Sequence, residues 1–234
     1  MTPMSQPQAE PDEFGPRVDP TPAPRPGPVT LTGRYGTVVR LDAARHGGDL
    51  WEAVRGNDSI WNYLPYGPFA DKGAFTTWVG ERARLQDPFY YAVLGPDGRA
   101  VGVATLMEIR PAMRVIEVGH IMYGTPLQRT PLATEAQYLL ARYIFETLGY
   151  RRYEWKCNAH NEPSRRAALR FGFTFEGVFR QHMIVKGRNR DTAWYSMLDS
   201  EWPARKAAFE RWLAPENFDA SGRQRTSLGE LNSA

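Results

Sequence analysis

The spacing of apolar residues divides the first half of the chain into short extended runs and two helical ones. Helices are expected at Asp49–Arg55 and Lys72–Leu85, on either side of the aromatic loop SIWNYLPYGPF. The tetrapeptide GPDG at 95–98 is a strong turn signal between two β-rich runs and predicts a hairpin. The strands expected in this half are Gly36–Leu41, FYYAVLG, RAVGVATLMEIR and Val115–Tyr123.

The second half opens with an amphipathic helix, expected from Pro131 to Thr147 and ended by Gly149. Its apolar residues recur at helical spacing, which gives one buried face: Leu132, Ala136, Leu139, Leu140, Tyr143 and Ile144. Further on, Asn161 and Gly172 mark the start and end of another helix. The remaining strands are expected at Arg152–Cys157, Phe173–Val185 and Thr192–Leu198.

This order of elements predicts an α/β fold with a mixed sheet. No G-x-G-x-x-G follows a strand, which argues against a doubly wound dinucleotide fold. One domain is expected over residues 34–213. Residues 1–30 are rich in proline and poor in large apolar side chains, which predicts a disordered tail. Residues 214–234 are polar and aperiodic, which predicts a flexible C-terminal tail.

Composition narrows the class of protein further. No apolar run reaches the roughly 18 residues of a membrane span, and no secretory signal is visible, so the expected location is the cytoplasm, with no membrane partner. The single cysteine, Cys157, cannot form an internal disulfide and fits a reducing compartment. The four histidines lack the spacing of metal ligands, so no metal is expected.

The net charge of +3 is small but unevenly distributed, because residues 151–190 hold ten Lys or Arg against three acids. Such a segment fits the phosphates of a cofactor, an acidic protein surface, RNA, or a basic face in contact only with solvent. Aromatic residues do not alternate with these basic ones as a base-stacking platform requires, so a nucleic-acid partner is not favoured.

The segment QRTPLATEA marks the most informative turn. A strand ends at Tyr123, a short turn follows, and a helix begins near Pro131, so the first helical N–H groups point outward without partners. Such an end attracts phosphate. Most helix starts carry polar residues without any ligand, so this feature alone does not decide the function.

Several motifs taken together resemble the GNAT superfamily of acetyl-CoA-dependent N-acetyltransferases, and more narrowly its ribosomal-protein N-terminal acetyltransferase branch. They are EVGHIMYGTPLQRTPLATEA, YEWKCNAHN, NEPSRRAALRFGF and FEGVFR, and the resemblance covers about residues 34–202. It implies a twisted, mostly antiparallel sheet with helices on both faces and a pair of splayed parallel strands, Val115–Tyr123 and Arg152–Cys157. Acetyl-CoA would lie in that splay.

The resemblance also assigns the residues that would contact acetyl-CoA. The pyrophosphate would rest on the turn, and free backbone amides of the splayed strand would bind the pantetheine arm together with Asn161. The turn residues are Gln128, Arg129, Thr130, Leu132 and Ala133, and the strand residues are Ile121, Met122 and Tyr123.

The chain departs from the family at Pro131, where glycine is usual. Proline has no N–H, so at most one hydrogen bond to phosphate is lost. Its fixed φ suits the first helical turn, where the donor is not needed by the helix. The substitution is therefore expected to weaken or shift the grip on phosphate without abolishing it.

Catalysis would need a base to take a proton from the amine and a donor to assist the departing thiolate. The resemblance implies Ser164 as the donor, since Ala168 stands where many GNAT enzymes have tyrosine. A plain helix-start hydroxyl is the alternative for Ser164. The glutamate expected after the E-G pair is missing from RQHMIVKG, which leaves Glu117 and His182 as candidate bases, with His120 and His160 behind them.

Trp61, Tyr63 and Tyr66 lie where this fold covers the acceptor side and are the candidate acceptor contacts, with packing under the loop as the alternative. The expected reaction is direct transfer of acetyl to a primary amine, either a protein N-terminus or a small molecule. Two other readings stay open: a non-catalytic acyl-CoA-binding module, favoured by Pro131 and the missing glutamate, and an RNA-associated protein using the basic segment. A homodimer also stays open.

Overall fold

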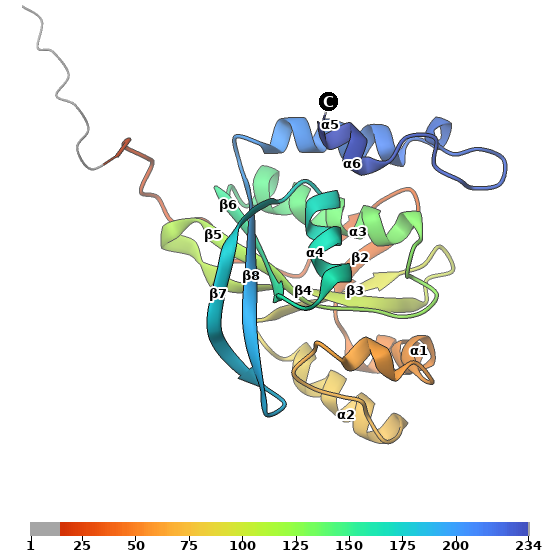
Figure 1. Ribbon diagram of the computed structural model, residues 1–234. Coiled ribbons are helices and arrows are strands. Elements are labelled where there is room, and N and C mark those ends of the chain that lie inside the picture. The colour runs from red at the N-terminus through yellow and green to blue at the C-terminus, as the bar shows by residue number, and fades with distance from the viewer. Residues whose placement is uncertain (1–14, 234) are drawn as a thin grey trace, which may run out of the picture.

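A computed structural model describes residues 15–233 as one mixed sheet between two helical layers (Figure 1). The sheet order is β1-β2-β3-β4-β5-β6-β8-β7. Its strands are β1 (Thr30–Thr32), β2 (Thr37–Arg40), β3 (Phe89–Leu94), β4 (Ala100–Arg110), β5 (Val115–Tyr123), β6 (Arg152–Asn158), β7 (Thr174–Val185) and β8 (Arg188–Leu198). The helices are α1 (Ala43–Val54), α2 (Lys72–Ala83), α3 (Pro131–Arg142), α4 (Glu162–Arg170), α5 (Trp202–Leu213) and α6 (Leu228–Ser233).

The parallel pairing of β5 with β6 stands out, because the other strand pairs are antiparallel. Register partners run from Val115 opposite Arg152 to Val118 opposite Trp155 and then stop, although both strands continue. The mixed, mostly antiparallel sheet and its splayed parallel pair confirm the predicted fold.

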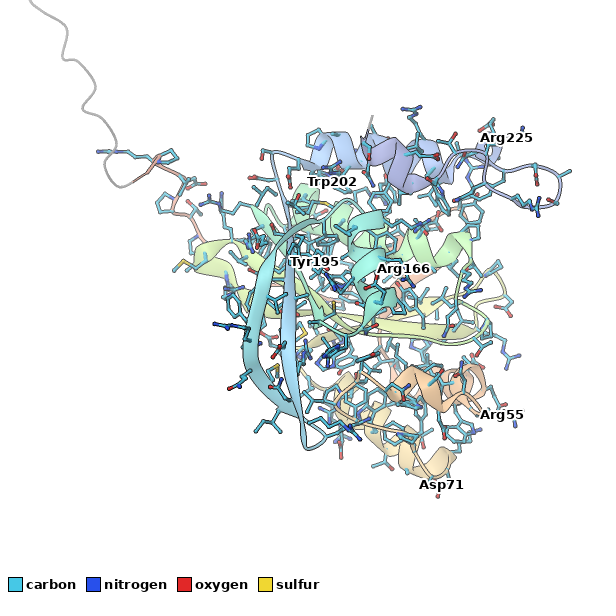
Figure 2. All side chains as sticks on the ribbon, in the orientation of Figure 1. Arg55, Asp71, Arg166, Tyr195, Trp202 and Arg225 are labelled. Atoms are coloured by element: carbon cyan, nitrogen blue, oxygen red, sulfur yellow. The ribbon has the colours of Figure 1, made fainter. Side chains whose placement is uncertain are left out.

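Helices cover both faces of the sheet, also as predicted. Figure 1 shows α1 and α2 on one face and α3, α4, α5 and α6 on the other. The aromatic side chains of α1 and α2 pack with β3 in one core, while α3 and α5 pack against β5, β6 and β8 in a second, larger core. In Figure 2 side chains fill the space between the sheet and each helical layer.

The first helix begins six residues earlier than predicted, at Ala43 rather than Asp49. The pair Gly47–Gly48 argues against a helix in the sequence, because glycine has a low helix propensity. In the structure Gly47 is buried against α2, where an added Cβ would lie 3.4 Å from Thr76. The Asp42 side chain accepts a hydrogen bond from the Arg45 amide at 2.9 Å and caps the helix.

We expect Asp42→Ala to lower the free energy of unfolding by about 1 kcal/mol, because one amide of the first turn loses its acceptor. Urea denaturation followed by circular dichroism would measure the change. Asp42→Asn keeps an acceptor oxygen and should stay within a few tenths of a kcal/mol of the wild type. Equal losses in both variants would argue against the cap.

The C-terminal segment is not the flexible tail that was predicted for 214–234. Leu228 is fully buried in the larger core, and α6 packs on both α5 and α4. The Asn217 amide donates to the carbonyls of Trp212 and Thr226 at 3.1 Å each. The contacts of α6 with α4 join residues that are far apart along the chain. The polar, aperiodic sequence of the segment therefore gave no sign of them.

The N-terminal prediction covers two parts. Residues 1–14 lie outside the described residues. Residues 15–30 are extended, as their prolines suggest, but they are held against the body rather than disordered. Ala23 is buried and its amide donates to the Pro111 carbonyl at 3.0 Å. The carbonyl of Gly27 accepts from the Tyr91 hydroxyl at 2.9 Å.

Candidate active site

The splay between β5 and β6 begins at a bulge in β5. Thr105 of β4 lies opposite Gly119 and Val103 opposite Met122, so two residues of β5 face one of β4. One of those two, His120, has a φ of +46°. A bulge bends its strand, and here it occurs where β5 leaves β6. Within residues 15–233, backbone groups of Ile121, Met122 and Tyr123 on the β6 side therefore have no sheet partner.

The turn after β5 ends at the N-terminus of α3, as predicted. The Thr130 hydroxyl accepts from the Ala133 amide at 3.3 Å and caps the helix. Gln128 donates from its side chain to the Tyr123 carbonyl at 2.8 Å, which holds the turn against the strand end. Arg129 has a φ of +61°. Within the part of the chain that the structure describes, the amides of Arg129 and Leu132 have no acceptor.

Pro131 occupies the first turn of α3, the position that its fixed φ suits. It therefore helps to start the helix whose end forms the turn. The two free amides, of Arg129 and Leu132, flank it on either side, so the turn keeps donors for an anion despite the proline.

Ser164 and Asn161 lie across the splay at the start of α4. The Asn161 side chain accepts from the Ser164 amide at 3.2 Å, so it caps this helix. The Ser164 hydroxyl oxygen accepts from the Trp155 indole N–H at 3.1 Å, which leaves the hydroxyl proton available to another acceptor. The hydroxyl also faces Cys157 of β6, a buried thiol whose pKa is raised by its burial.

Glu117 projects from β5 on the opposite face of the sheet, just before the splay. It is buried, and the Lys156 ammonium lies 2.7 Å from its carboxylate. Burial raises the pKa of Glu117 to about 7, against the opposing effect of Lys156. A carboxyl group that titrates near neutral pH is suited to accept a proton from an amine.

His182 is separated from that pair. It is exposed on β7, where its Nδ1 lies 3.0 Å from the Thr192 hydroxyl. The indole of Trp194 lies between them, with its centroid 5.9 Å from the His182 ring and 4.0 Å from the Lys156 ammonium. Glu117 and His182, the two candidate bases, therefore lie on different sides of Trp194 and do not contact each other.

His120 has surroundings that the sequence did not indicate. Its Nδ1 lies 3.0 Å from the Tyr66 hydroxyl, and its ring stacks with those of Tyr66 and Tyr90. Burial lowers the pKa of His120 to about 4, with Arg82 and Arg190 adding to the effect, so the imidazole is neutral at pH 7. Only the positive φ at the bulge brings this ring between the two tyrosines, and no residue pattern reveals that conformation.

The three predicted acceptor contacts have different environments. Trp61 is only 3% exposed and packs with Phe69 and Phe75, so the packing alternative holds for it. Tyr66 is turned toward His120. Tyr63 is exposed, and its hydroxyl donates to the His160 carbonyl at 3.0 Å, which joins its loop to the segment before α4.

A second contact holds the same loop after α1. The ammonium group of Lys186, at the tip of the β7–β8 hairpin, donates to the Trp61 carbonyl at 2.9 Å. The loop after α1 is thus tied at two points, to the β6–α4 segment through Tyr63 and to the hairpin through Trp61. We call these two contacts the loop bridges.

Half of the ten basic residues of segment 151–190 are partly buried, and several of these contact other side chains of the protein. Arg152 pairs with Glu154 and Glu176, Arg165 contacts the Tyr195 hydroxyl, and Arg170 contacts the Thr134 hydroxyl. The segment therefore does not present its ten charges as one face, which weakens the reading of an RNA-binding surface.

The comparison with protein families decides the identity. Residues 39–174 match the model of the acetyltransferase (GNAT) domain, which is more than half of the chain. The chain belongs to the GNAT acetyltransferase family. This confirms the resemblance that the motifs carried, and the GNAT family uses acetyl-CoA.

Relatives of this GNAT protein are known by structure and by sequence. A GCN5-related N-acetyltransferase from Brucella melitensis is 49% identical, with a TM-score of 0.89 over 92% of this chain and 98% of that one. The uS5-alanine N-acetyltransferase of Escherichia coli (strain K12) is 26% identical over 68% of this chain and 78% of its own length. YdaF of Bacillus subtilis (strain 168), provisionally named a ribosomal N-acetyltransferase, is 31% identical over 47% of this chain, and the match spans 60% of its length.

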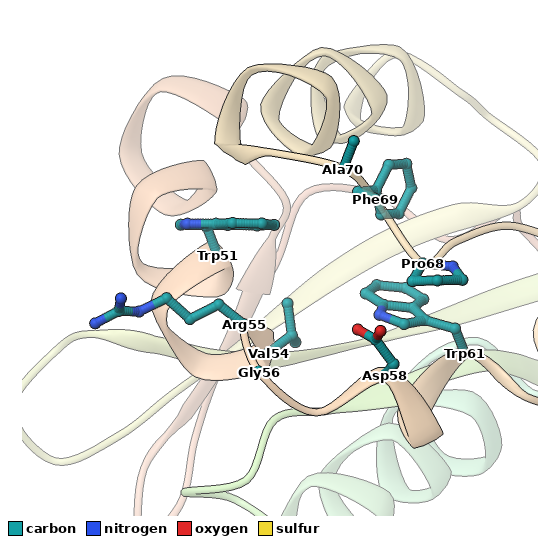
Figure 3. A pocket seen from close by; sticks show the side chains of 9 residues that line it. All are labelled: Trp51, Val54, Arg55, Gly56, Asp58, Trp61, Pro68, Phe69 and Ala70. Carbon is teal, nitrogen blue, oxygen red and sulfur yellow. The ribbon is translucent and has the colours of Figure 1, made fainter.

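A hollow of about 510 Å³ lies on the α1 side of this GNAT domain (Figure 3). Trp51 and Trp61 stand on opposite sides of it in that view, with Asp58 and Arg55 as polar members. Trp61 is the one predicted site residue that lines it, and none of the predicted catalytic or cofactor residues does. The hollow is therefore separate from the splay.

None of the helices described is both long and apolar enough to cross a bilayer. Among residues 15–233, no three His, Cys, Asp or Glu side chains come together as metal ligands would.

Proposed function

We propose that this GNAT acetyltransferase transfers acetyl directly from acetyl-CoA to a primary amine, with no acetyl-enzyme intermediate. The observation that carries the proposal is the placement of Glu117 and Ser164 on opposite faces of the sheet at the start of the splay. Acetyl-CoA, when bound, supplies a thioester carbonyl open to attack by an amine. The unpaired amides of Arg129 and Leu132 and the unpaired edge of β5 fit its phosphates and its pantetheine arm.

Glu117 acts as the base in this proposal. An amine must lose its proton to become a nucleophile, and a carboxylate with a pKa of about 7 can take it at neutral pH. Below that pKa Glu117 is itself protonated, so turnover should fall as the pH drops. Cys157 is buried and its thiol pKa is raised, which disfavours an acetyl-cysteine route.

Ser164 acts as the donor to the departing thiolate. Because its oxygen already accepts from Trp155, its proton points elsewhere. We expect Ser164→Ala to lower kcat about tenfold, the effect of one lost hydrogen bond to a charged group, with the Kd for acetyl-CoA little changed. Steady-state kinetics together with calorimetric titration would separate the two quantities. Unchanged kcat would remove Ser164 from the mechanism.

A protein N-terminal amine is the leading acceptor, since relatives named for that reaction cover most of the domain. Such an acceptor would place the reaction in the cytoplasm. A small-molecule amine is the second candidate, and the loop bridges favour it, because they narrow the acceptor side. A panel of short peptides and small amines, assayed by release of free CoA, would choose between them.

Calorimetry first tests whether acetyl-CoA is the acetyl donor. Acetyl-CoA should bind in the micromolar range, and acetyl-pantetheine, which lacks the phosphates, should bind at least about tenfold more weakly, because the α3 turn would have no anion to hold. Equal affinities would argue against the turn as a phosphate site. If neither compound bound, acetyl-CoA would be excluded as the acetyl donor.

A further inference from the structure

Three buried side chains form a charged chain beside the proposed base. The Lys156 ammonium lies 2.7 Å from one carboxylate oxygen of Glu117 and 3.0 Å from one of Glu154. The exposed fractions of the three side chains are 7% for Glu117, 10% for Lys156 and 4% for Glu154. The indole of Trp194 covers the ammonium at 4.0 Å.

The two carboxylates are not equivalent. Glu154 has two further cations, Arg110 at 2.5 Å and Arg152 at 2.8 Å. Glu117 has Lys156 as its one ion-pair partner among the described residues. A buried carboxylate with one partner is far easier to neutralise than one with three, because burial favours the uncharged form.

The shared ammonium removes the usual obstacle to such a change. When one partner of a buried ion pair becomes neutral, the other is left as an unpaired buried charge, which costs several kcal/mol. Here Lys156 would keep Glu154 as its partner after Glu117 takes a proton. The local structure therefore tolerates both states of Glu117.

We propose that Lys156 is a positioning residue that lets Glu117 alternate between carboxylate and carboxylic acid during acetyl transfer. Its ammonium pairs with both Glu117 and Glu154 when Glu117 is charged, and with Glu154 alone when Glu117 is protonated. The inference rests on the proposed function, in which Glu117 is the base. The acceptor ammonium gives one proton to the Glu117 carboxylate and becomes a neutral amine. As the amine forms the amide C–N bond, the thioester C–S bond breaks, and the second proton lost by nitrogen goes to the departing thiolate. The proton leaves Glu117 for solvent after turnover.

The charged groups around Glu117 set the direction of each test. On β6 Lys156 favours its carboxylate form, while Glu154 opposes it; on β4 Glu108 opposes it as well. On β8 the Arg190 guanidinium is close enough for Glu117 to stabilise its charge. Removing Lys156 should therefore raise the titration midpoint of Glu117, whereas removing the charge of Glu154 should lower it.

The experiment is a carbon-13 NMR titration of the glutamate side-chain carboxyls in the full chain, with Glu117 assigned by comparison with Glu117→Gln. We expect the Glu117 midpoint to move up by about one pH unit in Lys156→Met, down in Glu154→Gln, and little in Lys156→Arg. The acid limb of kcat against pH should move in the same order. Circular dichroism would verify that each variant is folded, and Lys156→Gln serves as a second neutral variant if Lys156→Met is not.

Two results would overturn the inference. One is an unchanged Glu117 midpoint in both Lys156→Met and Lys156→Gln. The other is a shift in the same direction for the Lys156 and Glu154 variants, which would indicate a general loss of packing. If instead the midpoints move as expected but Glu117→Gln retains turnover, Glu117 is not the base and that part of the proposed function fails. The titration would still show that Lys156 controls the protonation of Glu117.

Discussion

Glu117→Gln should lower kcat by about 10³-fold, the middle of the range for loss of a general base. Glutamine has nearly the same shape but cannot accept the proton of the amine. Because Glu117 does not line the α3 turn, the Kd for acetyl-CoA should stay within about threefold of the wild type. Steady-state kinetics and calorimetric titration at pH 7.5 would measure both quantities.

The pH profile gives an independent readout of the same group. Glu117 works as a carboxylate and its pKa is raised to about 7, so wild-type kcat should fall as the pH drops below about 7. The limb due to Glu117 should vanish in Glu117→Gln. Glu81→Gln, on the exposed side of α2, is the matched control and should behave as the wild type. A Glu117→Gln enzyme with full kcat would exclude Glu117 as the base.

Glu135→Ala should lower the free energy of unfolding by about 3 kcal/mol. The buried Glu135 carboxylate accepts hydrogen bonds from three consecutive amides, those of Arg34, Tyr35 and Gly36, at 2.6, 2.7 and 3.2 Å. Losing it leaves three donors of the β1–β2 turn without an acceptor, each at a cost of about 1 kcal/mol where water reaches the turn. Urea denaturation would measure the loss.

The controls separate the carboxylate from general effects of truncation. Glu135→Gln keeps one acceptor oxygen and should lose about half as much. Glu210→Ala, on a half-exposed side chain of α5, should lose less than about 1 kcal/mol. If Glu135→Ala lost no more than Glu210→Ala, the three amide bonds would not matter to stability. The glutamate of QRTPLATEA would then have no role in stability.

Strong periodicity accounts for the elements that were predicted well. The strand Val115–Tyr123 was predicted with the bounds that the structure has, and the helix expected from Pro131 to Thr147 corresponds to α3 together with the π-helical turn Tyr143–Thr147 that continues it. The errors arose where distant contacts override local preference. Gly47 belongs to a helix because α2 lies against it, and Leu228 is buried because α4 and α5 surround it.

The site also combines local features, which the sequence reveals, with distant contacts, which it does not. The cap at Thr130 and the start of α4 at Asn161 are local features, and a sequence motif can reveal them. The partners of Glu117 cannot be read from the sequence, since Lys156 comes from a strand 39 residues away and its second carboxylate, Glu154, from the same strand. The conformation of His120 depends on a bulge whose register only the folded sheet fixes.

In the proposed function, the loop bridges also hold the loop after α1 over the acceptor side. Each is a single hydrogen bond, exposed for Tyr63 and partly buried for Lys186, worth about 1 kcal/mol. Breaking the two bonds alone costs about 2 kcal/mol, which limits the open population to at most roughly 3% at room temperature, because the packing of Trp61 on Phe69 and Phe75 adds to the cost. Under the proposed function, a small amine would react with the closed form, whereas a bulkier acceptor would need the minor open form or enough binding energy to hold it open.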